Sequence, residues 1–102
     1  MAAVPKRLYK GLATTTATNV YPVPTGAITM VKAVTLCNTT SAVATFKMSL
    51  GGTSVIFDHQ IKANDTVTIP FLDQIMSAGE AIQISCTPSN AISVYISGKE
   101  VT

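Results

Sequence analysis

The sequence has no tryptophan, a single histidine and only five acidic residues, and these shortages limit the chemistry that the protein can perform. His59 has Asp58 beside it, but adjacent residues on a strand point to opposite faces, so the pair forms no catalytic dyad without a bulge. Asp65, Asp73 and Glu80 fall in turns, where acidic residues serve as turn formers. We therefore expect no enzymatic activity, no metal site and no cofactor.

Long apolar runs and metal-type cysteine spacings are also missing. No apolar stretch approaches the roughly 18 residues of a membrane span, so we expect no membrane insertion. The N-terminus MAAVPKRLYKGL has no apolar central region of the signal-peptide kind, which favours cytoplasmic synthesis without secretion. Cys37 and Cys86 are far apart and lack a cluster of ligand partners. We expect free, buried thiols, and a disulfide would require two strand ends to lie side by side.

Charge is scarce as well, and its distribution argues against several classes of partner. Charged residues make up 12% of the chain and apolar residues 47%, which excludes a disordered protein. The surface must then consist largely of uncharged polar residues, a composition suited to a permanent assembly. The net charge is +2, with Lys6, Arg7 and Lys10 close together. Nucleic-acid binding normally needs a broader basic face interleaved with aromatic residues, so we expect a solvated N-terminal arm and no nucleic-acid partner.

The clearest feature that the sequence does contain is a long strand pattern within residues 26–40, GAITMVKAVTLCNTT. Val34 and Leu36 alternate with polar or small residues until a cluster of turn residues, Asn38-Thr39-Thr40-Ser41, ends the pattern. Further back the alternation breaks, because Val31 falls on the opposite face. A β-bulge near Val31 and Lys32 would return Val31 to the buried side, and a strand buried on both faces is the alternative. A strand of this length needs partners on both sides.

Further segments show strand periodicity and are separated by turns about every ten residues. They cover residues 7–10, 43–50, 53–61, 66–71, 81–86 and 91–97. Gly51-Gly52 predicts a tight hairpin, since glycine supplies the positive φ angles of such a turn. Residues 13–19 are polar and β-branched and predict a surface loop or an edge strand. Residues 20–24 contain two prolines, which predict an edge or a transition from strand to turn. Residues 72–76 could form a short strand, a 3₁₀ turn or a loop.

No segment combines helical periodicity with capping residues, so the fold class is predicted to be all-β. Seven or eight short strands joined by turns predict an antiparallel β-sandwich that is jelly-roll-like. Residues 1–102 then form a single domain, and residues 1–19 form an extended N-terminal arm or an edge strand.

The alternation also predicts which side chains are buried. The expected core includes Val34, Leu36, Phe46, Met48, Ile84 and Val94. Within 53–61, Val55, Phe57, His59 and Ile61 are expected to share one face, which would place His59 at the margin of the core or in a subunit contact.

Six residues are candidates for an interface or a ligand contact: Tyr95, Ser93, Tyr9, Thr14, Thr16 and Thr18. Sugar-binding faces rely on exposed aromatic rings, and Tyr95 and Tyr9 are the tyrosines whose positions allow exposure. The alternative is that these tyrosines pack at strand edges or against a neighbouring subunit.

Five short motifs occur in a recognisable order along the chain. They are LYKG at residues 8–11, VYPVPTG at 20–26, VKAVTLCNTT at 31–40, MSAGEAIQIS at 76–85 and ISGKEV at 96–101. In this order the motifs resemble a family of small all-β structural proteins and domains of tailed bacteriophages. The resemblance spans nearly the whole chain and implies a non-enzymatic virion component related to tail, fibre or receptor-binding domains. It supplies no catalytic residue.

The combined expectation is a phage structural protein that is made in the host cytoplasm and then incorporated into the virion as a tail, fibre or head-accessory component. The resemblance favours a homo-oligomer, specifically a trimer, with other virion proteins as partners and a host cell-surface glycan as a further one. The first alternative is a stand-alone carbohydrate- or receptor-binding module. The second alternative is a small hydrolase built on Asp58 and His59.

Overall fold

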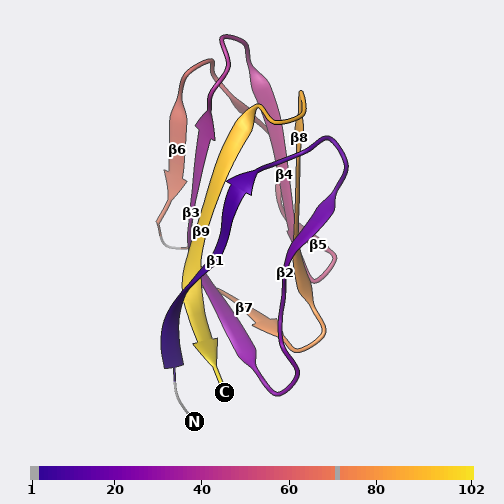
Figure 1. Cartoon of the computed structure of the whole chain (residues 1–102), viewed down its shortest axis with the longest axis vertical. Coiled ribbons are helices and arrows are strands. Elements are labelled where there is room, and N and C mark those ends of the chain that lie inside the picture. The colour runs from indigo at the N-terminus through magenta and orange to yellow at the C-terminus, as the bar shows by residue number, and fades with distance from the viewer. Residues whose placement is uncertain (1–2, 71) are drawn as a thin grey trace.

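The computed structural model describes residues 3–70 and 72–102, which form two antiparallel sheets packed face to face (Figure 1). Sheet A contains, in order, β1 (Ala3–Leu12), β9 (Ile92–Val101), β3 (Ile28–Asn38) and β6 (Thr66–Ile69), and β7 (Gln74–Ser77) pairs with the first part of β3. Sheet B contains β2 (Thr18–Pro22), β8 (Ala81–Thr87), β4 (Ala44–Leu50) and β5 (Thr53–Ile61) in that order. The predicted all-β sandwich is confirmed, with nine strands rather than seven or eight.

The strand order is that of a jelly roll once β7 is set aside. In sheet A the first strand, β1, pairs with the last strand, β9. In sheet B the second strand, β2, pairs with β8. Such nesting is produced when a long hairpin of strands folds over on itself into two sheets. Strand β7 is not part of the jelly-roll order and pairs with residues 28–31 of β3. The short β6 pairs with residues 34–37, further along the same edge of β3.

The bulge expected in the central strand is confirmed. The register between β3 and β9 shifts between Val31 and Ala33, and Val31, Val34 and Leu36 are all fully buried. One extra residue therefore brings side chains on both sides of Lys32 onto the same face. The strand has β9 on one side and β6 with β7 on the other, as its length required.

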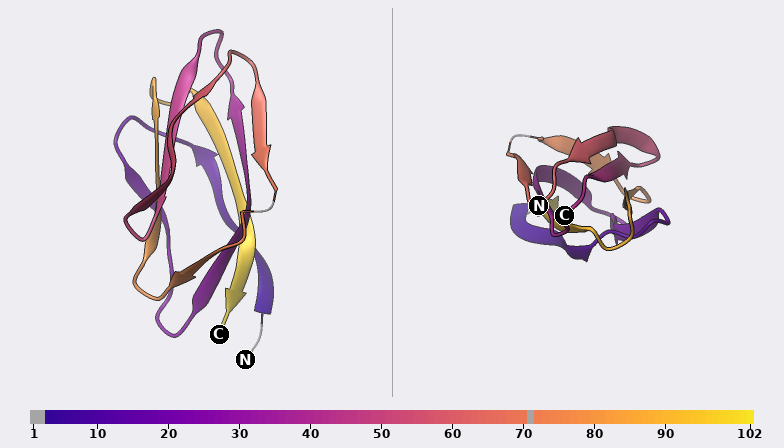
Figure 2. Two further views of the ribbon diagram at one scale, coloured as in Figure 1. Left: turned by 180° about the vertical axis from the view of Figure 1, so that it is seen from behind. Right: turned by 90° about the horizontal axis from the view of Figure 1, so that it is seen from above.

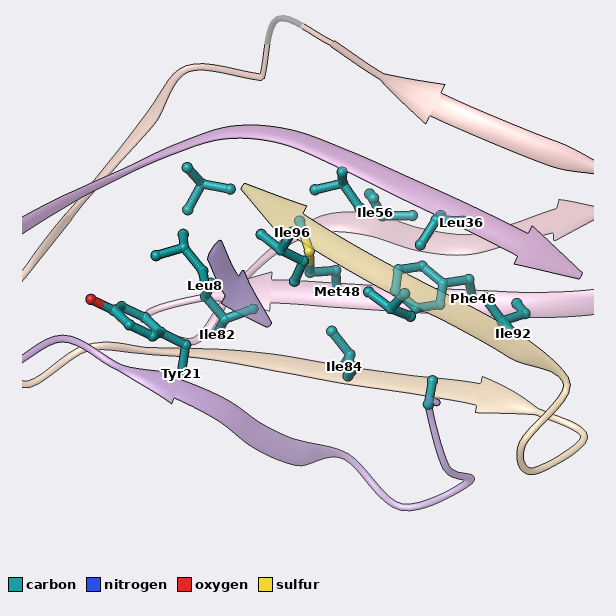
Figure 3. Close-up of a cluster of buried hydrophobic side chains, with 14 of the residues drawn as sticks. Leu8, Tyr21, Leu36, Phe46, Met48, Ile56, Ile82, Ile84, Ile92 and Ile96 are labelled. Atoms are coloured by element: carbon teal, nitrogen blue, oxygen red, sulfur yellow. The ribbon is translucent and has the colours of Figure 1, made fainter. Parts of the chain in front are cut away.

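The core between the sheets contains all six side chains that alternation predicted, and each is at most 2% exposed. In the close-up of Figure 3, Phe46, Met48, Leu36 and Ile84 point into the space between the two layers. The hairpin predicted between β4 and β5 is confirmed, since Gly51 and Gly52 both have positive φ angles of 58° and 86°.

Strand β5 departs from its predicted pattern because it contains two bulges. Its register with β4 shifts once around Val55 and again where Phe57 and Asp58 together face Lys47. Each extra residue moves the following side chains to the other face of the sheet. As a result Ile61 is buried, whereas Phe57 is 67% exposed. The prediction that Val55, Phe57, His59 and Ile61 share one face is therefore wrong.

The structure extends one expected strand and places two segments that had no firm prediction. The strand expected at residues 7–10 is longer and forms the edge strand β1, and residues 13–24 contain the edge strand β2. Of residues 72–76, the last three belong to β7, while the expected strand position of Phe71 lies outside the described residues. Because β1 and β9 are antiparallel and Ala3 pairs with Val101, the start of β1 and the end of β9 lie together at one end of the sandwich (Figure 2).

Candidate functional site

The outward side of sheet A is the surface on which the predicted contact residues Ser93 and Tyr95 lie. Buried Ile92, Val94 and Ile96 alternate with them along β9, so both point away from the core. We call this outward side the sheet A face. It is defined by Arg7, Lys10 and Leu12 of β1, by Ser93, Tyr95 and Lys99 of β9, by Ile28, Met30, Thr35 and Cys37 of β3, and by Ile75 of β7.

Tyr95 stands between two hollows on this face. One hollow, of about 270 Å³, is lined by Lys10, Gly11, Leu12, Thr35, Cys37, Ser93, Val94 and Tyr95. The other, of about 340 Å³, is lined by Pro5, Lys6, Arg7, Tyr95, Ser97 and Gly98. The tyrosine ring is 44% exposed, so it is available to a partner that covers either hollow.

The remaining part of the sheet A face is apolar and exposed. Ile28 and Ile75 are 50% and 66% exposed, and Met30 lies next to Ile75 in the β3–β7 register. A contiguous group of apolar side chains on a folded surface marks an interaction site more often than isolated ones do. Sequence reasoning missed this group, although the alternation of Ile28 and Met30 with the buried Val31 signals that both point outward.

The other predicted contact residues lie elsewhere. Tyr9 faces the core, opposite Ile96, and its hydroxyl donates to the Leu12 carbonyl at 3.2 Å. Thr14 and Thr18 bond to the Thr16 carbonyl, each at 3.0 Å, within the loop between β1 and β2. The structure therefore brings together Tyr95 and Ser93, while Tyr9 supports the core and the three threonines stabilise their own loop.

A second apolar surface lies at the open side of the sandwich, between the edge strands β5 and β6. It is a hollow of about 350 Å³ lined by Val55, Ile56, Phe57, His59, Val67 and Ile69. His59 faces Phe46 in the β4–β5 register and lies exposed at this opening. The Asp58 carboxylate instead lies 3.4 Å from the Lys47 ammonium, whose side chain also covers the Phe57 ring at 5.0 Å. We call this surface the β5–β6 opening.

The two cysteines have different environments. Both are free thiols, and Cys86 is buried in sheet B with its Sγ 3.2 Å from the Ala13 carbonyl. Cys37 is partly exposed and lines the hollow beside Tyr95, so the expectation of two buried thiols is wrong for Cys37. The physical reason is its position on β3, one residue beyond the buried Leu36 and therefore on the outward side.

A polar network joins the two sheets at the end where the chain termini lie. The Tyr21 hydroxyl donates to the Glu100 carboxylate and lies 3.1 Å from the hydroxyl of the fully buried Thr29. Lys6 bonds to the same carboxylate at 3.1 Å. The hydrogen bond from Tyr21, followed by that from Lys6, holds the pKa of Glu100 below its ordinary value of 4.5. Burial, more than any other cause, raises the pKa of Tyr21 above 10.0.

This network predicts a pH dependence of stability. A carboxyl whose pKa is lowered by folding stabilises the fold above its unfolded pKa, and that contribution is lost as the pH falls through the folded pKa. The difference in unfolding free energy between the wild type and Glu100→Gln should be largest near neutral pH and should shrink below pH 4.5. Urea unfolding at several pH values measures it. A difference of the same size near neutral pH and at about pH 3 would show that Glu100 contributes no charge-dependent stability.

Within residues 3–70 and 72–102, His, Cys, Asp and Glu side chains do not gather in groups of three that suit a metal ion. In the same described ranges, no helix is long and apolar enough to cross a membrane. No protein-family model, curated protein or solved structure matches this chain.

Proposed function

We propose that the protein is a non-enzymatic structural subunit of a tailed-phage particle, which acts through contacts between subunits. The sequence motifs support the phage assignment, because their order resembles that of small phage structural proteins. The observation that carries the proposal is the grouping of exposed apolar side chains on two surfaces, the sheet A face and the β5–β6 opening. Surfaces of this kind favour permanent assembly over a free monomer.

The β5–β6 opening is the better candidate for contacts between copies of the chain. Its charged neighbours, Lys47 and Asp58, are paired with each other, so a second copy meets little net charge there. The sheet A face instead carries Arg7, Lys10 and Lys99, and two such faces opposed to each other would repel. Contacts between identical copies favour apolar surfaces with few unpaired charges.

A trimer agrees with this arrangement. In a ring of three copies each interface joins two different patches, so the β5–β6 opening would meet another region of the neighbouring subunit. The subunit would be made in the host cytoplasm and then incorporated into the tail, a fibre or the head surface, where other virion proteins would contact it.

The proposal predicts a closed oligomer in solution, with a trimer favoured, in size-exclusion chromatography with multi-angle light scattering. Phe57→Ser should shift the protein toward monomer, because Phe57 is the most exposed large apolar side chain at the β5–β6 opening. The substitution should leave the fold intact, since surface changes usually alter stability by less than about 0.5 kcal/mol.

Tyr95→Ser is the matched control, because it removes an exposed aromatic ring from the sheet A face and should leave the oligomer unchanged. A wild-type protein that stays monomeric at high concentration would contradict the self-assembly on which the proposal depends.

A second candidate function is binding of a host-surface carbohydrate at Tyr95. The position of this ring between two hollows favours it, because sugar rings stack on exposed aromatic faces. A glycan array compares the wild type with Tyr95→Ala. Binding that disappears in the variant supports this function, and silence of the wild type removes it.

A further inference from the structure

The sheet A face carries an excess of unpaired positive charge. Three of the lysines form ion pairs, Lys6 with Glu100, Lys32 with Asp73 and Lys47 with Asp58. Across the described part of the chain, no ion pair involves Arg7, Lys10 or Lys99, and all three lie on the sheet A face. The strand register explains this grouping, because the cations occupy outward positions of two neighbouring strands, β1 and β9.

These cations follow one another along the face from Tyr95. Lys10 is its register partner on β1, and Arg7 pairs with Ser97, two residues along the same side of β9. Lys99 lies a further two residues along and faces Met30 across the β3–β9 register. Tyr95 therefore has one cation beside it and two more further along the face, and the apolar side chains of β3 and β7 begin next to Lys99.

Four of the five acidic residues have partners of their own, and the fifth, Asp65, lies in the connection between β5 and β6. Glu100 points inward to Tyr21, Asp58 lies beside Lys47, and the Glu80 carboxylate accepts a hydrogen bond from the Ser77 amide at 2.7 Å. Asp73 reaches the margin of sheet A but lies 2.7 Å from Lys32, which neutralises it. A partner that covers the sheet A face must therefore supply negative charge of its own.

The composition of the face points to a protein partner. Tyrosine, methionine and arginine are enriched at protein interfaces, and Tyr95, Met30 and Arg7 all belong to the face. Three strands of ten or eleven residues, with β6 and β7 sharing a fourth position, lie about 4.8 Å apart and cover on the order of 600 Å². This area approaches the roughly 800 Å² that one partner contributes to a standard interface. A nucleic acid would satisfy the cations but would leave Ile28 and Ile75 against a charged backbone.

From these observations we infer that the sheet A face is the docking surface for a second protein whose contact patch is acidic where it meets β1 and β9 and apolar where it meets β3 and β7. The inference rests on the proposed function and names the chemistry of one partner in the particle. It assigns self-assembly to the β5–β6 opening and partner docking to the sheet A face, so an experiment can contradict one of them without contradicting the other.

A random copolymer of glutamate and tyrosine is a suitable probe, because it combines acidic and aromatic side chains in one polypeptide. Its affinity for the wild type is measured by fluorescence anisotropy at about 50 and about 300 mM NaCl. We expect binding that weakens at the higher salt concentration, since exposed charges are screened. Lys10→Glu, Arg7→Glu and Tyr95→Ala should each weaken binding by about tenfold.

Lys62→Glu is the matched control, because Lys62 is an exposed cation in the connection between β5 and β6. The same charge reversal there should leave the affinity unchanged. Lys10→Gln and Arg7→Gln provide milder variants if a reversal prevents folding. The reactivity of Cys37 reports where the copolymer binds. Cys37 lines the hollow beside Tyr95, so it should react more slowly with a maleimide when the copolymer is bound.

Three outcomes would overturn the inference: no binding of the copolymer, equal losses in Lys62→Glu and Lys10→Glu, or unchanged labelling of Cys37. Tighter binding of heparin or of an oligothymidylate than of the copolymer would also overturn it, in favour of an anionic sugar or a nucleic acid. A protein that forms its oligomer but ignores the copolymer leaves the proposed function intact, whereas a monomer that binds the copolymer removes self-assembly and retains docking.

Discussion

Replacing Phe46 with alanine is expected to lower the free energy of unfolding by about 3–5 kcal/mol. Phe46 is fully buried and is the largest of the side chains that the core encloses completely. It lies on β4 in the middle of sheet B and points toward sheet A, so the surrounding side chains of two rigid layers cannot collapse into the space that it leaves. A cost of this size is a large fraction of the ~5–15 kcal/mol by which whole domains are stable.

Urea unfolding followed by circular dichroism measures the effect of Phe46→Ala. Val43→Ala is the control, since Val43 is 55% exposed just before β4 begins and should change the unfolding free energy by less than about 0.5 kcal/mol. If the two variants unfold at the same urea concentration, Phe46 does not occupy the packed centre of the sandwich.

Replacing Asn38 with alanine is expected to cost about 2–4 kcal/mol, because several buried polar groups lose their partners at about 1–3 kcal/mol each and water recovers only part of the loss. Asn38 is fully buried at the end of β3. Its Nδ2 donates to the carbonyls of Ala42, Ile61 and Lys62 at 2.8, 3.0 and 3.2 Å. Its Oδ1 accepts from the amide and the hydroxyl of Thr40 at 3.0 and 2.7 Å.

These bonds join the end of a sheet A strand to the end of β5 in sheet B, so one side chain holds the two layers together. Asn19→Ala is the matched control, because Asn19 is exposed on the edge strand β2 and should change stability by less than about 0.5 kcal/mol. Equal unfolding free energies for the two variants would mean that the Asn38 bonds add nothing to stability beyond what water supplies.

Alternation in the sequence was sufficient to predict β3, β4, β8 and β9, because each has one face against the core and one face outward. The same principle failed for β5, where two bulges invert the faces within nine residues. Bulges are set by the pairing of distant strands, and the local pattern around Phe57 contains no sign of them. At Val31 the break in alternation was visible in the sequence, because strongly apolar residues both precede and follow the break.

Short edge strands were also hard to predict. Strands β2 and β7 have five and four residues, and β2 ends in a proline, so neither offers enough repeats to separate a strand from a loop. Asn38 was interpreted as a turn residue because asparagine is typical of turns. Its burial depends on the approach of the end of β5 at Ile61, which lies 23 residues further along the chain.

For the candidate site, the sequence was sufficient to place Tyr95 and Ser93 on an outward face. The number and sign of the charges around Tyr95 could not be predicted, because Arg7 and Lys10 reach it only through the pairing of the first strand with the last. The apolar part of the face likewise depends on the pairing of Met30 with Ile75. Which side chains meet across distant strands depends on the strand pairing and its register, and a single sequence does not reveal these.

The nested strand order has a consequence for how the protein is made. Strand β1 is synthesised before the other strands of the sandwich and its sheet partner β9 after them, and β2 is likewise made well before its partner β8. Such distant pairing makes folding slow and leaves early strands unpaired for the whole of synthesis. With few charges to keep growing chains apart, neighbouring copies on one messenger RNA are exposed to mispairing through β1 and β2 until β9 closes the sandwich.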